Sequence, residues 1–405
     1  MNYLYKIQKI NKNEYENTIL SIALVAPFVI LPIQFFLLTF FELFHTDIAS
    51  KIQTFSKLTV GLIYLYALPI IIKKSKIKII GIYTIAFLIF LVNFILFPEN
   101  HIHLKDLIFP VFFMCLPAFI FSICIYNVNI LKRVMLKASL IVLLLGIILS
   151  TLIFIGGASV GRYSLPLSYY MLLPTIMYLD EFFEKISVKA LLYALVSLMI
   201  ILSLGSRGAL ICSALFVILK LARFDYKLSY RKMVFYFSSI GTIVALLLYS
   251  KQILEYLYIF FLNIGIESRT IRVLLSDDIP LSGRDNLYEN VIREILINPI
   301  LGIGIGGDRA VNGIYVHNFF LEVLANFGVI IGTILIIVFL LIIFKNLTIK
   351  NKEIYNIVII WLGIGFFPFM MSSSYIENIK FWIMLGLLTG LLKFNKNYKV
   401  SFSRK

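Results

Sequence analysis

The sequence predicts an all-α integral membrane protein, and three observations lead to that prediction. The chain of 405 residues is 60% hydrophobic and only 14% charged, whereas soluble domains are roughly 25% charged. Its mean hydropathy is +0.96. Apolar runs of about 20 residues, each long enough to cross a bilayer as a helix, recur from Thr18 to the C-terminus. Strand-length alternation is absent, so backbone polar groups within lipid must be satisfied inside helices.

About twelve transmembrane helices are expected, in three regions of the chain. Residues 1–250 hold helices one to nine, residues 251–316 form one large outer loop, and residues 317–405 hold the last three helices and a polar tail. No cleavage site of small residues follows the first apolar run, which is therefore expected to be a retained helix. The expected spans are 18–41, 57–72, 79–97, 107–126, 134–155, 164–179, 188–204, 209–222, 233–250, 317–344, 354–371 and 376–392.

The basic residues between the spans predict the orientation. If the N-terminus is cytoplasmic, the segments on that side hold 25 basic residues and those on the other side hold 12, which together make the 37 of the chain. The positive-inside rule therefore predicts that both termini are cytoplasmic. The same scatter argues against nucleic-acid binding, because the net charge of +16 is not gathered into a patch.

Arginine is concentrated on the outer side, where 7 of the 11 arginines in the chain are expected. A guanidinium matches a phosphate bidentately, whereas a lysine acts as a hydrated point charge. Arg162 lies in GGASVGRYSLPLSYY at the outer entrance to a span, and Arg207 lies in LGSRGAL, a short turn between two spans. An arginine so placed must either reach outward to the interface or hold an anion in the bundle.

The stretch from Ser282 to Gly328 is the longest part of this apolar chain that bilayer spans cannot absorb. Ser282 is expected to cap an amphipathic helix, with Asp285 three residues on, and Asn298 and Pro299 are expected to stop that helix after about Ile297. Its apolar face is predicted to consist of Leu287, Val291, Ile295 and Leu296.

A glycine-rich run, LGIGIGG at residues 301–307, follows this helix. It resembles a phosphate-cradling loop, but it lacks the lysine and the following Ser or Thr of a nucleotide P-loop, so that motif is rejected. Two interpretations remain open at this stage. The backbone amides of the run line a polar cavity, or the run is a hinge.

His317 and Asn318 open the next span, and Glu322 lies about one turn further along. A lone histidine near a helix start is commonly a cap or a core hydrogen-bonding residue. Ionisable groups within the membrane are costly, however, and usually mark a functional cavity. His317 is therefore the candidate proton acceptor, since a neutral imidazole has a suitable pKa. Glu322 and Asn318 are candidates to support it.

The sequence offers no metal site. Asp277 and Asp278 are adjacent and would point apart, and no other acidic cluster of the outer side joins them. The cysteines, Cys115, Cys124 and Cys212, lie in or beside apolar spans, where thiols usually behave as small hydrophobes. The expected chemistry is metal-independent and needs no cofactor.

These motifs together resemble the bacterial O-antigen polymerase and O-antigen ligase superfamily. The resemblance rests on the outer turn SRG at Arg207, the loop with SGR at Arg284, the helix ending in NP, the GIGIGG run, and HNFFLEVLANFG at His317. It covers residues 155–330 in motif and the whole chain in topology. It implies a GT-C-like membrane glycosyltransferase at the outer face of the bacterial inner membrane.

What the resemblance implies for the site is specific. The donor is a glycan on undecaprenyl pyrophosphate, and outward-facing arginines bind the pyrophosphate while a histidine lies near the reacting sugar. By motif, these residues correspond to Arg207, Arg284 and His317, with Arg162 included among the arginines. The bundle is expected to bring Arg207 and Arg162 to the loop. A chain-length regulator protein is a further expected partner.

Three functions remain open from the sequence. The first is a polymerase that joins lipid-linked repeat units of O-antigen or a related surface glycan, favoured by a composition rich in Ile, Phe, Lys, Asn and Tyr. The second is a ligase that transfers the glycan to lipid A core. A lipid-linked glycan flippase also fits twelve helices, but the large outer loop and the lack of an internal repeat favour an enzyme.

Overall fold

The computed structural model describes most of the chain as two compact units. It describes residues 2–44, 46–154, 164–223, 241, 249–263, 265–266, 268–276 and 284–402. The first unit comprises Met1–Ile30, Thr54–Ala138 and Leu281–Lys405, and the second comprises Leu31–Gln53 and Ser139–Pro280. The expected outer loop, residues 251–316, is thus divided between the two units at Pro280.

The structure supports an all-α membrane protein. It is 85% helical, and no strand occurs among the described residues. Six described segments are long and apolar enough to cross a membrane, and they include most of α1 (Asn2–Phe40) and all of α5 (Val128–Phe154). The other four are Asp47–Leu96, Pro98–Ile123, Phe319–Leu347 and Lys352–Met370. The expected total of twelve spans stays a prediction, and the expected span 233–250 lies mostly outside the described residues.

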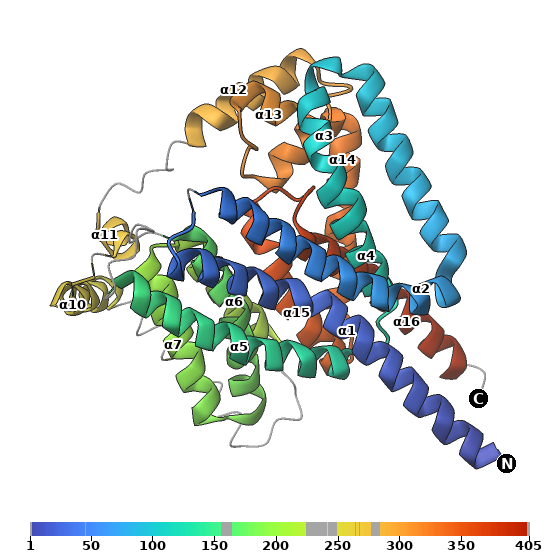
Figure 1. Cartoon of the computed structure of the whole chain (residues 1–405), viewed down its shortest axis with the longest axis horizontal. Helices are drawn as coiled ribbons and strands as arrows, with labels where there is room; N and C mark the ends of the chain where they lie inside the picture. The colour runs from blue at the N-terminus through green and yellow to red at the C-terminus, as the bar shows by residue number, and fades with distance from the viewer. Residues whose placement is uncertain are drawn as a thin grey trace. The chain divides into compact units, whose positions relative to one another are not determined.

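Helix α2 (Asp47–Leu96) contains two of the expected spans in one helical path. The lysine-rich segment KKSKIK was expected to be a loop, yet only Ser75, with φ −153° and ψ 34°, leaves the helical conformation. The segment contains no Gly or Pro, and its four lysines and one isoleucine tolerate a helix. The chain therefore turns at one residue, and α2 has a first limb before Ser75 and a second limb after it (Figure 1).

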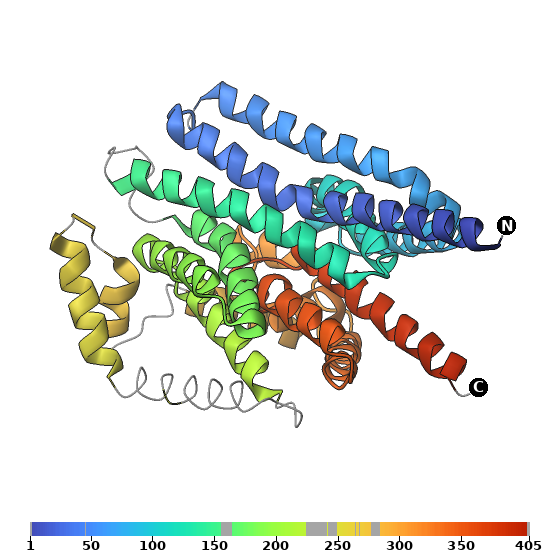
Figure 2. The ribbon, with the colours of Figure 1, turned by 90° about the horizontal axis from the view of Figure 1, so that it is seen from below.

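In the first unit, the first limb of α2 lies alongside α1 (Figure 2). Lys74 Nζ is 2.6 Å from Glu16 Oε2. After the second limb and the short turn η1 (Pro98–Asn100), the chain follows one path through α3 (His101–Phe109), the π-helical turn η2 (Pro110–Cys115) and α4 (Leu116–Ile123). One face of this path buries Leu104, Leu107, Val111 and Leu116 in a cluster with Ile305 and Ile376.

The amphipathic helix α12 (Arg284–Ile297) ends as predicted, directly before Asn298 and Pro299. Val291 and Ile295 are buried in a cluster with Ile303, Val316 and Ala325, so they form the packed face. The prediction was wrong for Leu296, which is 72% exposed. Its position next to Ile295 turns it about 100° away from that face. The expected cap, Ser282, lies outside the described residues.

The glycine-rich run makes a close backbone crossing against α14 (Phe319–Leu347), and its interpretation as a hinge stays a prediction. Gly302 has φ +71°, and a Cβ there would lie 2.3 Å from the Ala325 carbonyl oxygen. Gly328, with φ +74°, breaks α14 and would place a Cβ 2.1 Å from the Ile300 oxygen. The two backbones approach closely enough for Ile303 N to donate to Ala325 O at 2.7 Å and Val329 N to Pro299 O at 2.7 Å.

The same run is held from the other side by α2 and η1. Asn100 Nδ2 donates to Ile303 O at 2.7 Å, and Ile305 N donates to Asn93 Oδ1 at 2.7 Å. These bonds give Ile303 O and Ile305 N the partners that buried backbone groups require. The run leads into α13 (Gly307–Asn312), and α3, α12, α13 and α14 lie together in the first unit (Figure 1). The unit is completed by α15 (Lys352–Gly365), η3 (Phe367–Met370) and α16 (Ile379–Phe402).

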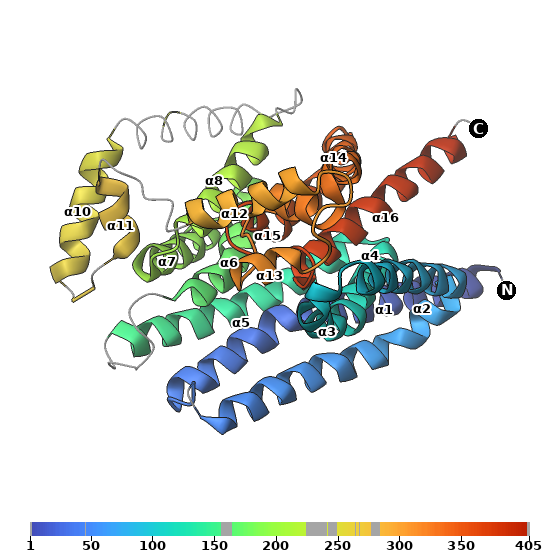
Figure 3. The same ribbon diagram turned by 90° about the horizontal axis from the view of Figure 1, so that it is seen from above.

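The second unit is built around α6 (Leu165–Lys185), α7 (Val188–Leu204) and α8 (Arg207–Ala222), which lie side by side (Figures 1 and 3). A buried ion cluster joins two of them, with Lys220 Nζ 2.5 Å from Asp180 and 2.9 Å from Glu184. The unit also contains α10 (Ser250–Asn263) and α11 (Arg269–Leu275).

Candidate functional site

The first unit contains a buried ionic cluster around Arg309 of α13. Arg309 is 8% exposed. Its Nη1 lies 3.3 Å from Asp308 Oδ1 and 3.6 Å from Glu322 Oε1, and its Nη2 lies 3.4 Å from Glu377 Oε1. Three carboxylates thus surround one cation. A buried charge is tolerated only where such partners compensate it.

Ser374 links the members of this cluster. Arg309 Nη2 donates to Ser374 Oγ at 3.0 Å, and the same hydroxyl donates to Glu322 Oε1. The second oxygen of Glu322 accepts from Tyr375 N at 3.2 Å. Glu322 is fully buried, so its carboxylate holds the polar segment between η3 and α16 against the first turn of α14.

Asp308 fixes the chain that leads to His317. Its Oδ2 accepts from Val316 N at 3.0 Å, and both residues are fully buried. His317 itself has φ +56°, an unusual conformation for a residue other than glycine. Such a conformation costs on the order of 1–3 kcal/mol and persists where the surroundings enforce it. The next residue, Asn318, caps α14 by accepting from Phe320 N and Leu321 N.

The imidazole of His317 has a defined tautomer. Its Nδ1 lies 3.2 Å from the carbonyl oxygen of Ser372. A carbonyl oxygen can only accept, so Nδ1 carries the hydrogen and Nε2 of the neutral ring is left as the proton acceptor. Tyr315 packs beside the ring, with 4.4 Å between ring centroids, and its hydroxyl donates to the same Ser372 oxygen at 3.5 Å.

The surroundings keep His317 neutral. Burial lowers the pKa of His317 below its ordinary value, the positive charge of Arg284 lowers it further, and the hydrogen bond to Ser372 and the charge of Asp308 oppose this only in part. Arg284 is the first residue of α12, and it acts in the same direction on the pKa of Tyr315. The structure therefore brings Arg284 and His317 into one electrostatic environment.

Arg309 stays charged in spite of its burial. Desolvation lowers the pKa of Arg309, but the charges of Asp308, Glu322 and Glu377 outweigh it and raise the pKa above its ordinary value. The pKa of Tyr315 is raised, mainly by burial, so its hydroxyl remains a donor. The groups near His317 thus include the charged guanidinium of Arg309, the acidic side chains around it and the neutral hydroxyl of Tyr315.

The remaining residues that the sequence predicted for the site lie elsewhere in the structure or outside the described residues. Arg207 is the first residue of α8 in the second unit, where Ser206 caps the helix by accepting from Ala209 N. Glu322 was a candidate to support the imidazole, but its carboxyl group accepts hydrogen bonds from Ser374 Oγ and Tyr375 N. The hydrogen-bond partner of the imidazole is the Ser372 carbonyl oxygen. Arg162, Asp277 and Asp278 lie outside the described residues.

Sequence reasoning missed most of the ionic cluster. Asp308 and Arg309 follow the glycine run directly, and Arg309 had been noted only as one of the outer arginines. Ser372, Ser374 and Glu377 lie in MSSSYIEN, a polar break that was assigned to the short loop between the last two expected spans and to the start of the second of them. A search for ionisable groups next to apolar spans would have found both segments.

No protein-family model matches this chain, and no curated protein matches it.

Proposed function

We propose that the protein is a polysaccharide polymerase that joins undecaprenyl-pyrophosphate-linked repeat units of O-antigen or a related surface glycan. One observation carries this proposal. His317 has an acceptor nitrogen set free by the bond from Nδ1 to Ser372, and the cation of Arg284 acts on the same ring. A proton acceptor beside a fixed guanidinium is what glycan transfer from a pyrophosphate requires.

The proposed reaction is one displacement. The hydroxyl oxygen of the acceptor sugar forms a bond to the anomeric carbon of the donor, and the bond from that carbon to the pyrophosphate oxygen breaks. The hydroxyl proton passes to Nε2 of His317. The electron pair of the broken bond leaves on the lipid pyrophosphate, whose growing negative charge Arg284 stabilises. In this proposal the reaction uses no cofactor and no metal.

The ionic cluster has a supporting part in this proposal. Arg309, Glu322 and Ser374 hold the segment that supplies the Ser372 carbonyl, and that carbonyl sets the tautomer of His317. Supporting residues that fix the orientation of a reacting group are a general requirement of precise sites. Arg207 keeps its motif-based assignment as a pyrophosphate-binding residue of α8, and Arg162 keeps the same assignment.

The proposed cellular setting follows the charge pattern. The chain crosses the bacterial inner membrane about twelve times in a GT-C-like arrangement, with both termini cytoplasmic and residues 251–316 on the outer face. Its role is in lipopolysaccharide biosynthesis or in a related polysaccharide pathway, and a chain-length regulator is a proposed partner.

Deletion of the gene tests the function directly. The expected phenotype is lipid A core that carries a single repeat unit, because capping continues when polymerisation stops. The measurement is a gel separation of surface glycans, with the plasmid-borne wild-type gene as the control. Bare core would instead indicate a ligase. Lipid-linked units left on the cytoplasmic face would indicate a flippase, and unchanged chain lengths would overturn all three.

Arg284→Lys tests the proposed phosphate contact. The variant is expected to lose transfer activity about 10- to 100-fold, because lysine keeps the charge but cannot donate two parallel hydrogen bonds to a phosphate. The measurement is glycan chain length in the complemented deletion strain, together with the amount of protein in the membrane. Arg293→Lys is the matched control, since Arg293 lies on the same helix, is exposed and pairs with Glu289. Near-normal chain length with Arg284→Lys would contradict the contact.

A further inference from the structure

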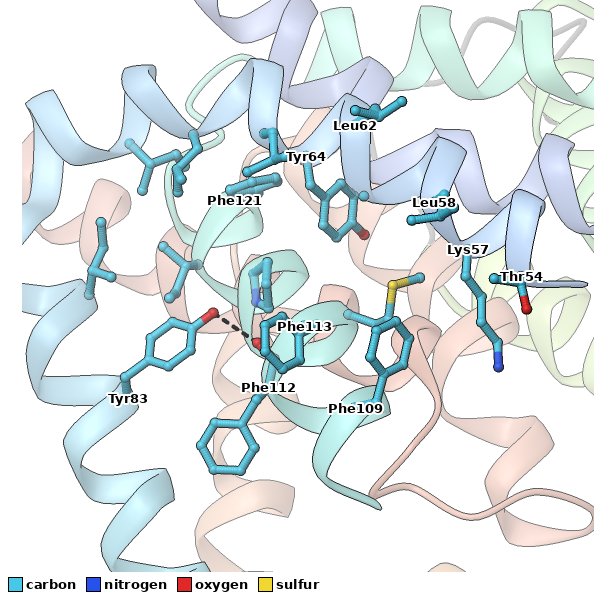
Figure 4. A pocket seen from close by; sticks show the side chains of 18 residues that line it. Thr54, Lys57, Leu58, Leu62, Tyr64, Tyr83, Phe109, Phe112, Phe113 and Phe121 are labelled. Carbon is cyan, nitrogen blue, oxygen red and sulfur yellow. Dashed lines mark hydrogen bonds between the residues drawn. The ribbon is translucent and has the colours of Figure 1, made fainter. Parts of the chain in front are cut away.

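An apolar groove of about 660 Å³ lies in the first unit between the first limb of α2 and the path from α3 to α4. Lys57 and Tyr64 extend from α2 toward the helical path that carries Phe109 and Phe113 (Figure 4). The groove is open on its outer side, where Leu62 is 66% exposed. In a membrane protein, an open apolar groove faces lipid chains.

The floor of the groove is one face of the first limb. The lining residues Lys57, Gly61, Tyr64, Leu68 and Ile71 recur at intervals of four and three, which places them in one row along the helix. From Lys57 to Ile71 the row is about 21 Å long at roughly 1.5 Å per residue, most of the thickness of a hydrocarbon core. The groove therefore has the length and the polarity of a lipid chain.

Its two ends differ in charge. Lys57 is the charged side chain among the described lining residues, and its amine lies 5.8 Å from the centre of the Phe109 ring. The opposite end, near Ile71 and Ile79, is apolar. A chain with an anionic head group would place its phosphate at the lysine and its hydrocarbon along the row.

The groove and the cluster that packs against the candidate site use largely different residues of the α3–α4 path, with Tyr83 and Phe112 between them. Phe109, Phe113 and Pro117 line the groove, whereas Leu104, Leu107, Val111 and Leu116 pack against Ile305 and Ile376 on the side of the ionic cluster. A phosphate at Lys57 is therefore a different phosphate from the one assigned to Arg284. A polymerase uses two lipid-linked substrates, and only the donor has its pyrophosphate at the reacting carbon.

We propose that this groove binds the polyprenyl chain of the acceptor, with the acceptor's phosphate at Lys57. The assignment rests on the proposed function, because a polymerase acceptor reacts at the far end of its glycan and keeps its own lipid carrier. The repeat unit then spans the distance from Lys57 to His317. The donor's pyrophosphate remains at Arg284.

Two glycines provide a matched pair of variants. A Cβ at Gly61 or at Gly81 would meet no atom within 4 Å, so both positions have room for the first atom of a side chain. Gly61 lines the groove, and Gly81, on the second limb, does not. Both replacements favour the helix by roughly 1 kcal/mol in propensity. A difference in binding between the two variants therefore measures the effect of filling the groove and not a general effect on the fold.

The first measurement is photocrosslinking in nanodiscs of phosphatidylglycerol, with a polyprenyl phosphate that carries a diazirine on its chain. We expect crosslinks in the first limb of α2 and in α3 to α4. Their yield should fall roughly tenfold in Gly61→Leu, as for an overfilled apolar site, and stay unchanged in Gly81→Leu. Lys57→Gln should weaken capture of the phosphate but not of the uncharged polyprenol. Equal yields in both leucine variants, or equal labelling by a diazirine phosphatidylglycerol, would overturn the proposal.

The second measurement separates this proposal from the proposed function. With purified protein, Gly61→Leu is expected to raise the KM for a long-chain acceptor about tenfold, and to leave unchanged the KM for the donor and for an acceptor with a short prenyl chain. A raised donor KM would overturn the acceptor assignment. Failure of the wild-type protein to transfer glycan would overturn the proposed function, while the crosslinking pattern would still decide whether the groove binds a polyprenyl phosphate.

Discussion

Arg309→Met is expected to lower the free energy of unfolding by about 3–5 kcal/mol, the cost typical of removing one partner from a buried ion pair. The guanidinium lies within 3.6 Å of Asp308 and Glu322 and within 3.4 Å of Glu377. Methionine keeps much of the side chain's length but leaves these carboxylates without their cation. Thermal unfolding of the purified protein in detergent measures the change.

Two further variants separate charge from packing in this experiment. Arg293→Met removes an exposed arginine that lies 3.5 Å from Glu289, and it is expected to change stability by less than about 0.5 kcal/mol. Adding Asp308→Asn to Arg309→Met should recover part of the loss, because it removes one of the stranded charges. A stability of Arg309→Met equal to that of Arg293→Met would show that the cluster does not hold the first unit together.

The fold class could be predicted from the sequence because hydropathy and helix end signals are local. The apolar runs and the stop at Asn298 and Pro299 each depend on neighbouring residues only, and each appears in the structure. The segment KKSKIK in α2 was wrongly predicted to be a loop, because that prediction used only its local charge. The charge of KKSKIK indicates exposure, but exposure alone does not end a helix, and a single residue, Ser75, makes the turn.

The ionic cluster could not be predicted in the same way, because its contacts join distant parts of the chain. Arg309 reaches Glu377 across 68 positions, and Ser374 reaches Glu322 across 52. Nothing local indicates which cation compensates which carboxylate. The sequence did single out His317 and Arg284 as residue types, but the tautomer of the ring depends on a backbone carbonyl 55 positions away.

The glycine-rich run shows how a motif can mislead when its partner is unknown. Two interpretations of the run were open, a set of backbone amides that line a polar cavity and a hinge. In the structure Gly302 is constrained by Gly328, 26 positions further on, at the crossing with α14. Two glycines with positive φ permit the backbones to hydrogen-bond directly, and α13, which carries Arg309, begins directly after this crossing. The position of Arg309 therefore depends on a packing contact that the local sequence does not indicate.

His317→Ala is expected to reduce glycan transfer by about 10²- to 10⁴-fold, the usual contribution of a general base. A loss in this variant alone could come from misfolding, since His317 has φ +56° and bonds to Ser372. His317→Asn resolves this, because asparagine tolerates positive φ and its amide can donate to the same carbonyl, yet it cannot take up a proton. We expect His317→Asn to be as inactive as the alanine variant, with near-normal thermal stability. An active asparagine variant would remove the base assignment.

The pH dependence of the wild-type protein is the second readout of this prediction. Burial and the charge of Arg284 lower the pKa of His317 below 6.5, so the neutral, proton-accepting ring predominates at neutral pH. Transfer should therefore be constant near neutral pH and fall as the pH decreases through this lowered pKa. Arg284→Gln removes a charge that lowers the pKa, so the residual activity of that variant should begin to fall at a higher pH. A fall at the same pH in both proteins would show that another group titrates, because only a base close to Arg284 is sensitive to its charge.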